Sequence, residues 1–173
     1  MKNKRRISLD VPGRKIRAMH IEKYDADRNA LLELFALADD SRTQIASYIG
    51  RGEVLVVRDG REIVGHLQIV ETDDVHVFEL KSMAVSEPRQ GQGIGRRLVE
   101  AAITLCRQRN GRRLIVSTAA ADTGNLRFYQ RQGFRMYRVV QDAFGPATGY
   151  PADALVDGIP LRDQVLLELD LTR

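Results

Sequence analysis

The chain has 173 residues, 43% of them hydrophobic, with one cysteine and no tryptophan, which is typical of one globular domain. Its formal net charge is +4, yet residues 1–17 hold seven basic side chains and one acidic one, so the remainder holds 20 basic and 22 acidic side chains. This balance excludes the spread-out basic surface of a nucleic-acid-binding protein.

The single Cys106 excludes an internal disulfide framework and a multi-cysteine zinc site, and no apolar run approaches the roughly 20 residues of a membrane helix. We expect a soluble, cytoplasmic protein with a basic, disordered tail at residues 1–14, one folded domain at residues 15–173, and no membrane or nucleic-acid partner.

The first half of the chain predicts two short helices and an antiparallel meander. A helix with an apolar stripe follows Asp27, and a second helix runs from Ser41 to Ile49; both Asp and Ser are residue types that cap helices. The dipeptide Asp59-Gly60 is typical of a hairpin turn. Strands are expected at residues 16–21, 53–58, 62–71 and 75–85.

After residue 86 the pattern changes to alternating helices and strands. A glycine-rich loop opens a long amphipathic helix that ends near Gly111, and a shorter helix follows Asp122-Thr123. Strands are expected at residues 114–117, 134–140 and 165–171. The Gly/Pro-rich stretch 143–160 between the last two is long enough to be a functional loop.

The glycine-rich loop reads Pro-Arg-Gln-Gly-Gln-Gly-Ile-Gly-Arg-Arg over residues 88–97, between a predicted strand and the start of a predicted helix. Free backbone N–H groups and the helix dipole favour phosphate at such a place, and glycine lets the backbone approach the anion closely. The loop lacks the Gly-Lys-Ser/Thr of a P-loop, and its Gly-x-Gly-x-Gly spacing differs from the dinucleotide fingerprint. The sequence therefore predicts another kind of phosphate-binding loop, with a flexible helix-capping turn as the alternative.

Two motifs resemble a known family. Gln90-Gly91-Gln92-Gly93-Ile94-Gly95, preceded by Met83-Ala84-Val85, resembles the acyl-CoA signature Gln/Arg-x-x-Gly-x-Gly/Ala of the GNAT superfamily of N-acetyltransferases. Asn125-Leu126-Arg127-Phe128-Tyr129, followed by Gly133-Phe134, resembles the second motif of that family. The resemblance implies an α/β, single-domain GNAT fold, with a mixed, mostly antiparallel sheet of about seven strands and helices on both faces. It also implies acetyl-CoA as co-substrate and no metal.

The reaction that the resemblance implies needs a base for the proton of the amine and an acid for the departing thiolate. Tyr129 matches the family tyrosine that protonates the thiolate, with core packing as its alternative. Glu79 matches the place where several members carry a general-base glutamate, with a salt bridge to Lys81 as its alternative. Strand alternation predicts that Glu79 shares a face with Lys81, Met83 and Val85.

The resemblance also assigns the acetyl-CoA site. The backbone of the Met83-Ala84-Val85 segment would pair with the pantetheine arm, and the N–H of Val85 would polarise the thioester carbonyl. Asn125 would bond to the same arm, with a helix cap as its alternative. The glycine loop and Arg96 would hold the phosphates, a role that Arg89 or Arg97 could take instead. Outside the site, Cys106 is predicted to be a small core residue and His76 is kept as a reserve base.

The sequence specifies the acceptor less closely. Six acidic residues of the first helices and the late loop could bind a cationic amine: Asp39, Asp40, Asp142, Asp153, Asp157 and Asp163. They favour a small polyamino substrate, most concretely an aminoglycoside-type antibiotic, with acetylation of a peptide or protein as the alternative. A non-catalytic acyl-CoA-binding sensor is the rival from another class, and Glu79 and Tyr129 argue against it. GNAT domains often dimerise, so a homodimer stays open.

Overall fold

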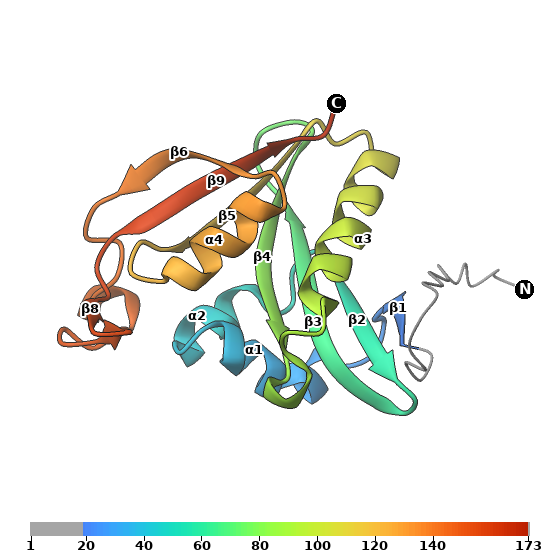
Figure 1. Ribbon diagram of the computed structural model, residues 1–173, viewed down its shortest axis with the longest axis horizontal. Coiled ribbons are helices and arrows are strands. Elements are labelled where there is room, and N and C mark those ends of the chain that lie inside the picture. The colour runs from blue at the N-terminus through green and yellow to red at the C-terminus, as the bar shows by residue number, and fades with distance from the viewer. Residues whose placement is uncertain (1–18, 173) are drawn as a thin grey trace, which may run out of the picture.

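The structure, a computed structural model, describes residues 19–172 (Figure 1). The tail expected at residues 1–14, and residues 16–18 of the strand expected at 16–21, lie outside the described residues. The helices and 3₁₀ turns are η1 (Arg28–Leu31), α1 (Leu32–Ala38), α2 (Arg42–Tyr48), η2 (Glu87–Arg89), α3 (Ile94–Gln108), α4 (Thr123–Arg131) and η3 (Pro146–Thr148). The strands are β1 (His20–Lys23), β2 (Glu53–Asp59), β3 (Glu62–Glu71), β4 (Val77–Val85), β5 (Arg113–Ala119), β6 (Arg135–Val140), β7 (Leu155–Val156), β8 (Ile159–Pro160) and β9 (Gln164–Asp170).

Within residues 19–172, seven strands form one sheet in the order β1-β2-β3-β4-β5-β9-β6. β4 and β5 run parallel, and the other neighbouring pairs of this sheet are antiparallel. α3 provides the crossover from β4 to β5, because parallel neighbours cannot be joined by a tight turn. The predicted mixed, mostly antiparallel sheet is confirmed. β7 and β8 form a separate small hairpin inside the expected late loop.

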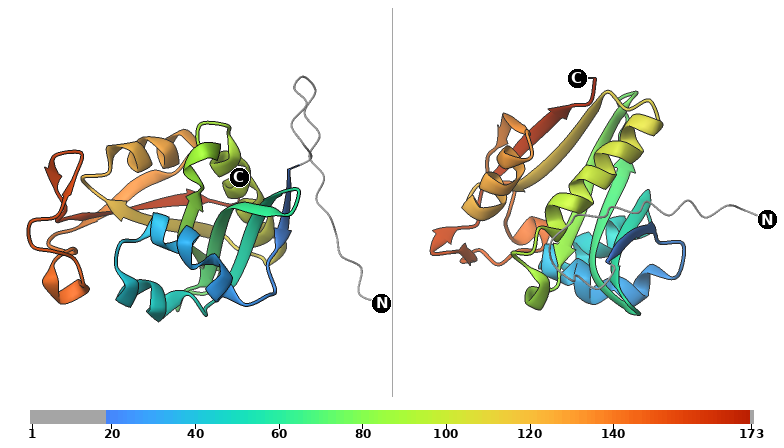
Figure 2. Two further views of the ribbon diagram at one scale, coloured as in Figure 1. Left: turned by 90° about the horizontal axis from the view of Figure 1, so that it is seen from below. Right: turned by 45° about the vertical axis from the view of Figure 1, so that its right-hand side comes forward.

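The sheet separates two apolar clusters, because side chains alternate along each strand. Leu55 and Val57 of β2 belong to the larger cluster, with α3 and α4, whereas Val54 and Val56 belong to the smaller one, with α1 and α2. Figure 2 shows helices on both sides of the sheet, which confirms that expectation. Cys106 lies in the larger cluster and is 1% exposed, as predicted for a small core residue.

Local sequence signals set several element ends. The Asp27 side chain accepts from the N–H of Asn29 at the start of η1, and Ser41 accepts from the N–H of Gln44 at the start of α2. β4 begins two residues later than predicted, because His76 has a φ of 65° and interrupts the extended backbone. No helix among residues 19–172 is long and apolar enough to span a bilayer.

Candidate active site

A cleft opens where β4 and β5 separate. Their parallel pairing ends at Leu80 and Val116, although β4 continues to Val85 and β5 to Ala119. Figure 1 shows the two strands close together at the end nearest the C-terminus and apart at the other. Beyond the last pair, the facing strand edges have no partner strand among residues 19–172, so their backbone groups are available to a ligand. The cleft has a volume of about 350 Å³ and is lined by both strands, α4, the α1–α2 segment and the late segment, residues 143–164.

A β-bulge in β4 changes which side chains face the cleft. Lys81 is the unpaired residue in the register between β3 and β4, directly after Leu80. An extra residue of this kind exchanges the two faces of the strand. Met83 and Val85 therefore pack against the larger cluster, on the face of Leu80, and the prediction that they share a face with Glu79 is wrong. Simple alternation cannot reveal such a bulge.

The glycine loop presents the open end of α3. Gly91 and Gly93 have φ values of 72° and 78°, a region that favours glycine, and a Cβ atom at either residue would meet nothing within 4 Å. Gly93 is the N-cap of α3, and no side chain there bonds to the N–H groups of the first turn. Gln90 Nε2 donates to the carbonyl oxygen of Val85 at 3.0 Å and so ties the loop to the end of β4. These uncapped N–H groups and the helix dipole form a site suited to phosphate.

The other predicted loop residues hold the loop and the helix in place. The Ile94 side chain is buried in the larger cluster. A Cβ atom on Gly95 would lie 3.4 Å from Cζ of Phe128, so glycine allows α3 and α4 to approach closely. Gln92 Nε2 donates to the carbonyl oxygen of Pro88 at 3.2 Å.

Three arginines near the loop have different partners. Arg89 Nη2 lies 2.5 Å from Oδ2 of Asp59, whose side chain is 6% exposed, so Arg89 fixes the start of the loop to the β2–β3 hairpin. Arg97 donates to a backbone carbonyl that precedes β1. Arg96 makes a surface ion pair with Glu100 at 2.8 Å. Because exposed ion pairs are weak, Arg96 is the arginine most easily redirected to a phosphate.

α4 presents Tyr129 and Asn125 to the cleft. The Tyr129 side chain is buried, and its ring makes edge-to-face contacts with Phe128 and Phe134 at centroid distances of 5.2 and 5.6 Å. Burial, and then the charge of Asp122, raise the pKa of Tyr129 well above its usual value, so the hydroxyl keeps its proton at neutral pH. Asp122 caps α4 by accepting from the N–H of Asn125 at 2.8 Å. The alternative that Asn125 is itself the cap is therefore wrong.

Glu79 is not among the residues that line the cleft. Its Oε1 lies 3.1 Å from Nζ of Lys81, in an ion pair whose two side chains are 23% and 30% exposed. Lys81 does line the cleft, and its Nζ lies 5.5 Å from the centre of the Tyr48 ring. The structure therefore places Glu79 one side chain away from the cleft.

Asp39, which also lines the cleft, accepts hydrogen bonds from three donors. Its Oδ1 accepts from the N–H of Ser41 at 2.9 Å and from the Tyr150 hydroxyl at 2.8 Å, and its Oδ2 accepts from the Tyr48 hydroxyl at 3.3 Å. Burial raises the pKa of both tyrosines, and the Asp39 charge raises it further. Tyr150 belongs to the late segment, so these bonds hold that segment against the α1–α2 connection. No sequence motif marks Tyr48 or Tyr150.

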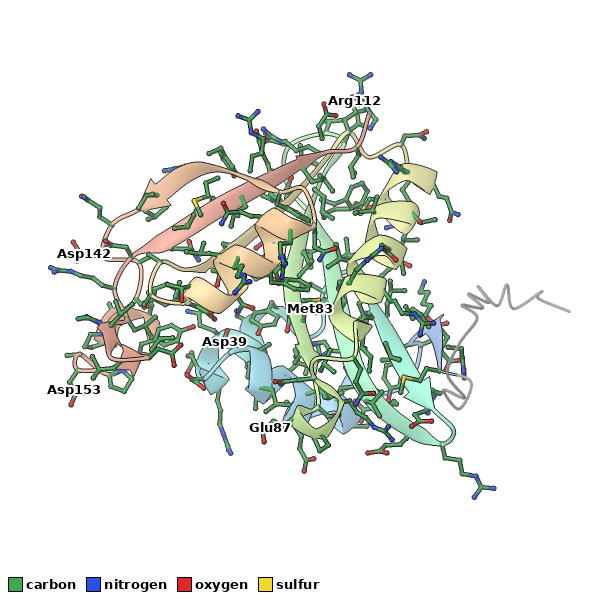
Figure 3. The ribbon with its side chains drawn as sticks, in the orientation of Figure 1. Asp39, Met83, Glu87, Arg112, Asp142 and Asp153 are labelled. Atoms are coloured by element: carbon green, nitrogen blue, oxygen red, sulfur yellow. The ribbon has the colours of Figure 1, made fainter. Side chains whose placement is uncertain are left out.

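Of the six acidic residues expected at the acceptor end, Asp39 and Asp40 line the cleft. In Figure 3, Asp39 lies beside α4, whereas Asp142 and Asp153 lie farther out, in the late part of the chain. Asp142 accepts from Arg162 Nε at 2.7 Å instead. The expectation is therefore wrong for the four acids that do not line the cleft: Asp142, Asp153, Asp157 and Asp163.

The described histidines lie outside the lining of the cleft. His66 is fully buried, its Nε2 lies 2.9 Å from Oγ of Ser82, and burial lowers its pKa to about 3, so it is neutral. His76, the reserve base of the sequence analysis, occupies the turn before β4. In the part of the chain that is described, no group of three His, Cys, Asp or Glu side chains is arranged to hold a metal ion.

Comparison with known proteins identifies the family. The model of the acetyltransferase (GNAT) family matches residues 20–134. The uncharacterized N-acetyltransferase YvbK of Bacillus subtilis is 31% identical over 153 residues, which cover 88% of this chain and 97% of that protein. The solved structure of the IAA acetyltransferase from Bacillus cereus ATCC 14579 is 31% identical with a TM-score of 0.79, and the match covers 88% of this chain and 99% of that one. A Bacillus subtilis acetyltransferase solved in complex with CoA is 30% identical with a TM-score of 0.80, covering 88% and 98%. The chain thus belongs to the GNAT family and is an acetyl-CoA-dependent N-acetyltransferase.

Proposed function

We propose that this enzyme transfers the acetyl group of acetyl-CoA directly to a primary amine of a small polyamino substrate. The main observation is the charge of the cleft, because the acids and bases in its lining are Asp39, Asp40 and Asp122 against one cation, Lys81, among the described residues. A cleft with excess negative charge attracts ammonium groups. Its volume of about 350 Å³, which the acceptor would share with the pantetheine arm, suits a small acceptor. An aminoglycoside-type antibiotic is the most concrete acceptor of this class.

The late segment supports a small acceptor over a peptide or protein. Tyr150 donates to Asp39, and Gln44 Nε2 donates to the carbonyl oxygen of Thr148 at 3.3 Å, so the late segment is bonded to α2 and its preceding turn. A peptide would need a groove that continues past this point.

We assign the acetyl-CoA site to the free edge of β4 and the start of α3. The backbone of the Met83-Ala84-Val85 segment would pair with the pantetheine arm, because no strand of residues 19–172 pairs with this edge beyond Leu80. Asn125, which lines the same cleft, would bond to that arm. The glycine loop, residues 90–95, and Arg96 would hold the phosphates at the uncapped N-terminus of α3.

The proposed chemistry uses Glu79 and Tyr129. Glu79 would accept the proton of the acceptor amine through a water, because its carboxylate does not itself line the cleft. Tyr129 would protonate the departing thiolate with the hydroxyl proton that burial preserves. Direct transfer is supported by Cys106, since burial raises the pKa of this thiol to about 12 and so removes it as a nucleophile.

Asp40→Asn tests the acceptor class. Asp40 is exposed and lines the cleft, so this substitution should raise KM for spermidine roughly fivefold to tenfold, the effect of one charge-assisted hydrogen bond. KM for acetyl-CoA should stay unchanged, and KM for butylamine should change less. Asp153→Asn is the matched control, because Asp153 is an exposed acid outside the cleft lining. Equal KM values for spermidine in the Asp40→Asn and wild-type enzymes would contradict the proposal.

Glu79→Gln tests the base. The loss of kcat/KM should be largest at low pH, where the acceptor amine is hardest to deprotonate. A loss of kcat/KM that is the same at every pH would contradict the role of Glu79 as base and would indicate a structural ion pair with Lys81.

We also propose a cytoplasmic homodimer that pairs along β6. β6 is an edge strand of the sheet, and its large apolar side chains Met136, Tyr137 and Val139 are exposed. Light scattering should then give a dimer mass that Val139→Lys lowers toward a monomer. A monomer mass for the wild-type chain would contradict this assembly.

A further inference from the structure

The cleft already contains a primary amine. The sequence has five lysines, Lys2, Lys4, Lys15, Lys23 and Lys81, of which Lys23 and Lys81 lie in the described residues. Lys81 and Tyr129 both line the cleft, whereas Lys23 lies in the edge strand β1. Lys81 is also the bulge residue of β4, between the two regular halves of the strand.

The surroundings of Lys81 match the needs of an acceptor amine. Its ammonium group lies 5.5 Å from the centre of the Tyr48 ring, a contact that holds the cation at the cleft, so a base must remove a proton before the amine can attack. Oε1 of Glu79 lies 3.1 Å away, within reach of a proton on that ammonium. Lys81 is thus the amine that the proposed base Glu79 contacts among residues 19–172.

We propose that Lys81 is a self-acetylation site, at which the enzyme acetylates its own ε-amino group when no acceptor is bound. Glu79 accepts one proton from the Lys81 ammonium, and the free amine attacks the thioester carbonyl carbon of acetyl-CoA in the same cleft. A C–N bond forms, the C–S bond breaks, and Tyr129 protonates the CoA thiolate. The amine loses its second proton as the amide forms, and Tyr129 recovers its proton from that release. The products are Nε-acetylated Lys81, CoA thiol and one proton in solution.

Acetylation would change the charge of the cleft. An acetylated Lys81 is neutral and cannot pair with Glu79 or hold a cation against the Tyr48 ring. The inference rests on the acetyl-CoA chemistry and the proposed roles of Glu79 and Tyr129, and it does not depend on the polyamine as acceptor.

Mass spectrometry of the full chain incubated with acetyl-CoA alone tests the inference. We expect intact chains to gain one acetyl group, and peptide mapping should locate it on Lys81. Acetylation of Lys81 should be at least about tenfold faster than that of Lys23, because a cleft-bound thioester has a high effective concentration. Lys23 is the demanding control, since its side chain is 53% exposed against 30% for Lys81, which favours Lys23 in uncatalysed acetylation. Lys81→Arg should abolish the gain, Lys23→Arg should preserve it, and Tyr129→Phe should slow it.

Two further measurements separate this inference from its competitors. The rate should be independent of chain concentration, because the lysine and the thioester share one cleft; a rate that rises with concentration would refute self-acetylation. Thiol release with spermidine is measured on the same preparation. Release with spermidine but no acetyl group on Lys81, or equal rates at Lys81 and Lys23, would overturn the inference. Acetylation of Lys81 without release from any amine would support it and would instead contradict the polyamine proposal.

Discussion

Replacing Tyr129 with phenylalanine removes the proposed proton donor and little else. The Tyr129 side chain is 5% exposed, and its contacts with Phe128 and Phe134 are between rings, so phenylalanine retains them. We therefore expect the free energy of unfolding to change by less than about 1.5 kcal/mol, as for other substitutions that nearly conserve volume. Affinity for acetyl-CoA should change by less than about threefold, because the hydroxyl acts on the departing sulfur during the reaction.

The loss should appear in kcat. A positioned general acid contributes at least about 100-fold, so kcat should fall by that factor, equivalent to roughly 3 kcal/mol of transition-state stabilisation. Because burial raises the pKa of Tyr129 well above its usual value, its deprotonation should not lower the wild-type kcat between about pH 7 and 9. Thiol release measured over this range in both proteins tests both statements. A kcat within about threefold of wild type would refute the proposed role. A wild-type decline in this range that Tyr129→Phe removes would contradict the raised pKa.

Three further predictions concern the loop and the core. Gly93→Ala should raise the Kd of acetyl-CoA about fivefold by calorimetry, because alanine disfavours the φ of 78° by about 1 kcal/mol, so the free loop leaves the conformation that binds phosphate. An unchanged Kd would contradict the role of the loop. His66, with a pKa lowered to about 3, stays neutral in the folded chain while the unfolded chain binds a proton below about pH 6.5. The free energy of unfolding should therefore fall by about 1.4 kcal/mol per pH unit as the pH drops from about 6.5 toward 3. Urea unfolding at several pH values measures this, and the same pH dependence in wild type and His66→Gln would contradict it. Phe35→Ala should cost about 3–5 kcal/mol of unfolding free energy, because the fully buried Phe35 ring packs against His66 and Tyr48; a loss below about 1 kcal/mol would contradict that packing.

The fold was predictable where local signals are strong. The hairpin at Asp59-Gly60 and the caps Asp27 and Ser41 depend on neighbouring residues alone, and the structure has them where the sequence predicted them. The bulge at Lys81 has no such signal. It depends on the register between two strands, which the alternation of apolar residues in one strand does not encode.

The residues of the candidate site likewise fall into those that local sequence motifs predict and those that only the folded chain brings together. Tyr129, Asn125 and the glycine loop belong to contiguous motifs, and the structure gathers them around the cleft and the start of α3. Tyr48 and Tyr150 are far apart in sequence and meet at Asp39 only in the folded chain. The acids of the late segment were overestimated for the same reason, because composition does not tell which loop carboxylates face a cleft.

Thiol release from acetyl-CoA across butylamine, spermidine, an aminoglycoside and a short peptide tests the central claim most directly, with Tyr129→Phe as the control. We predict that kcat/KM rises with the number of amino groups on the small acceptors and is higher for them than for the peptide. Added salt should lower kcat/KM, because the acidic lining of the cleft attracts cations. A higher kcat/KM for the peptide would contradict the claim. Thiol release with none of the amines, by a chain that binds acetyl-CoA, would also contradict it.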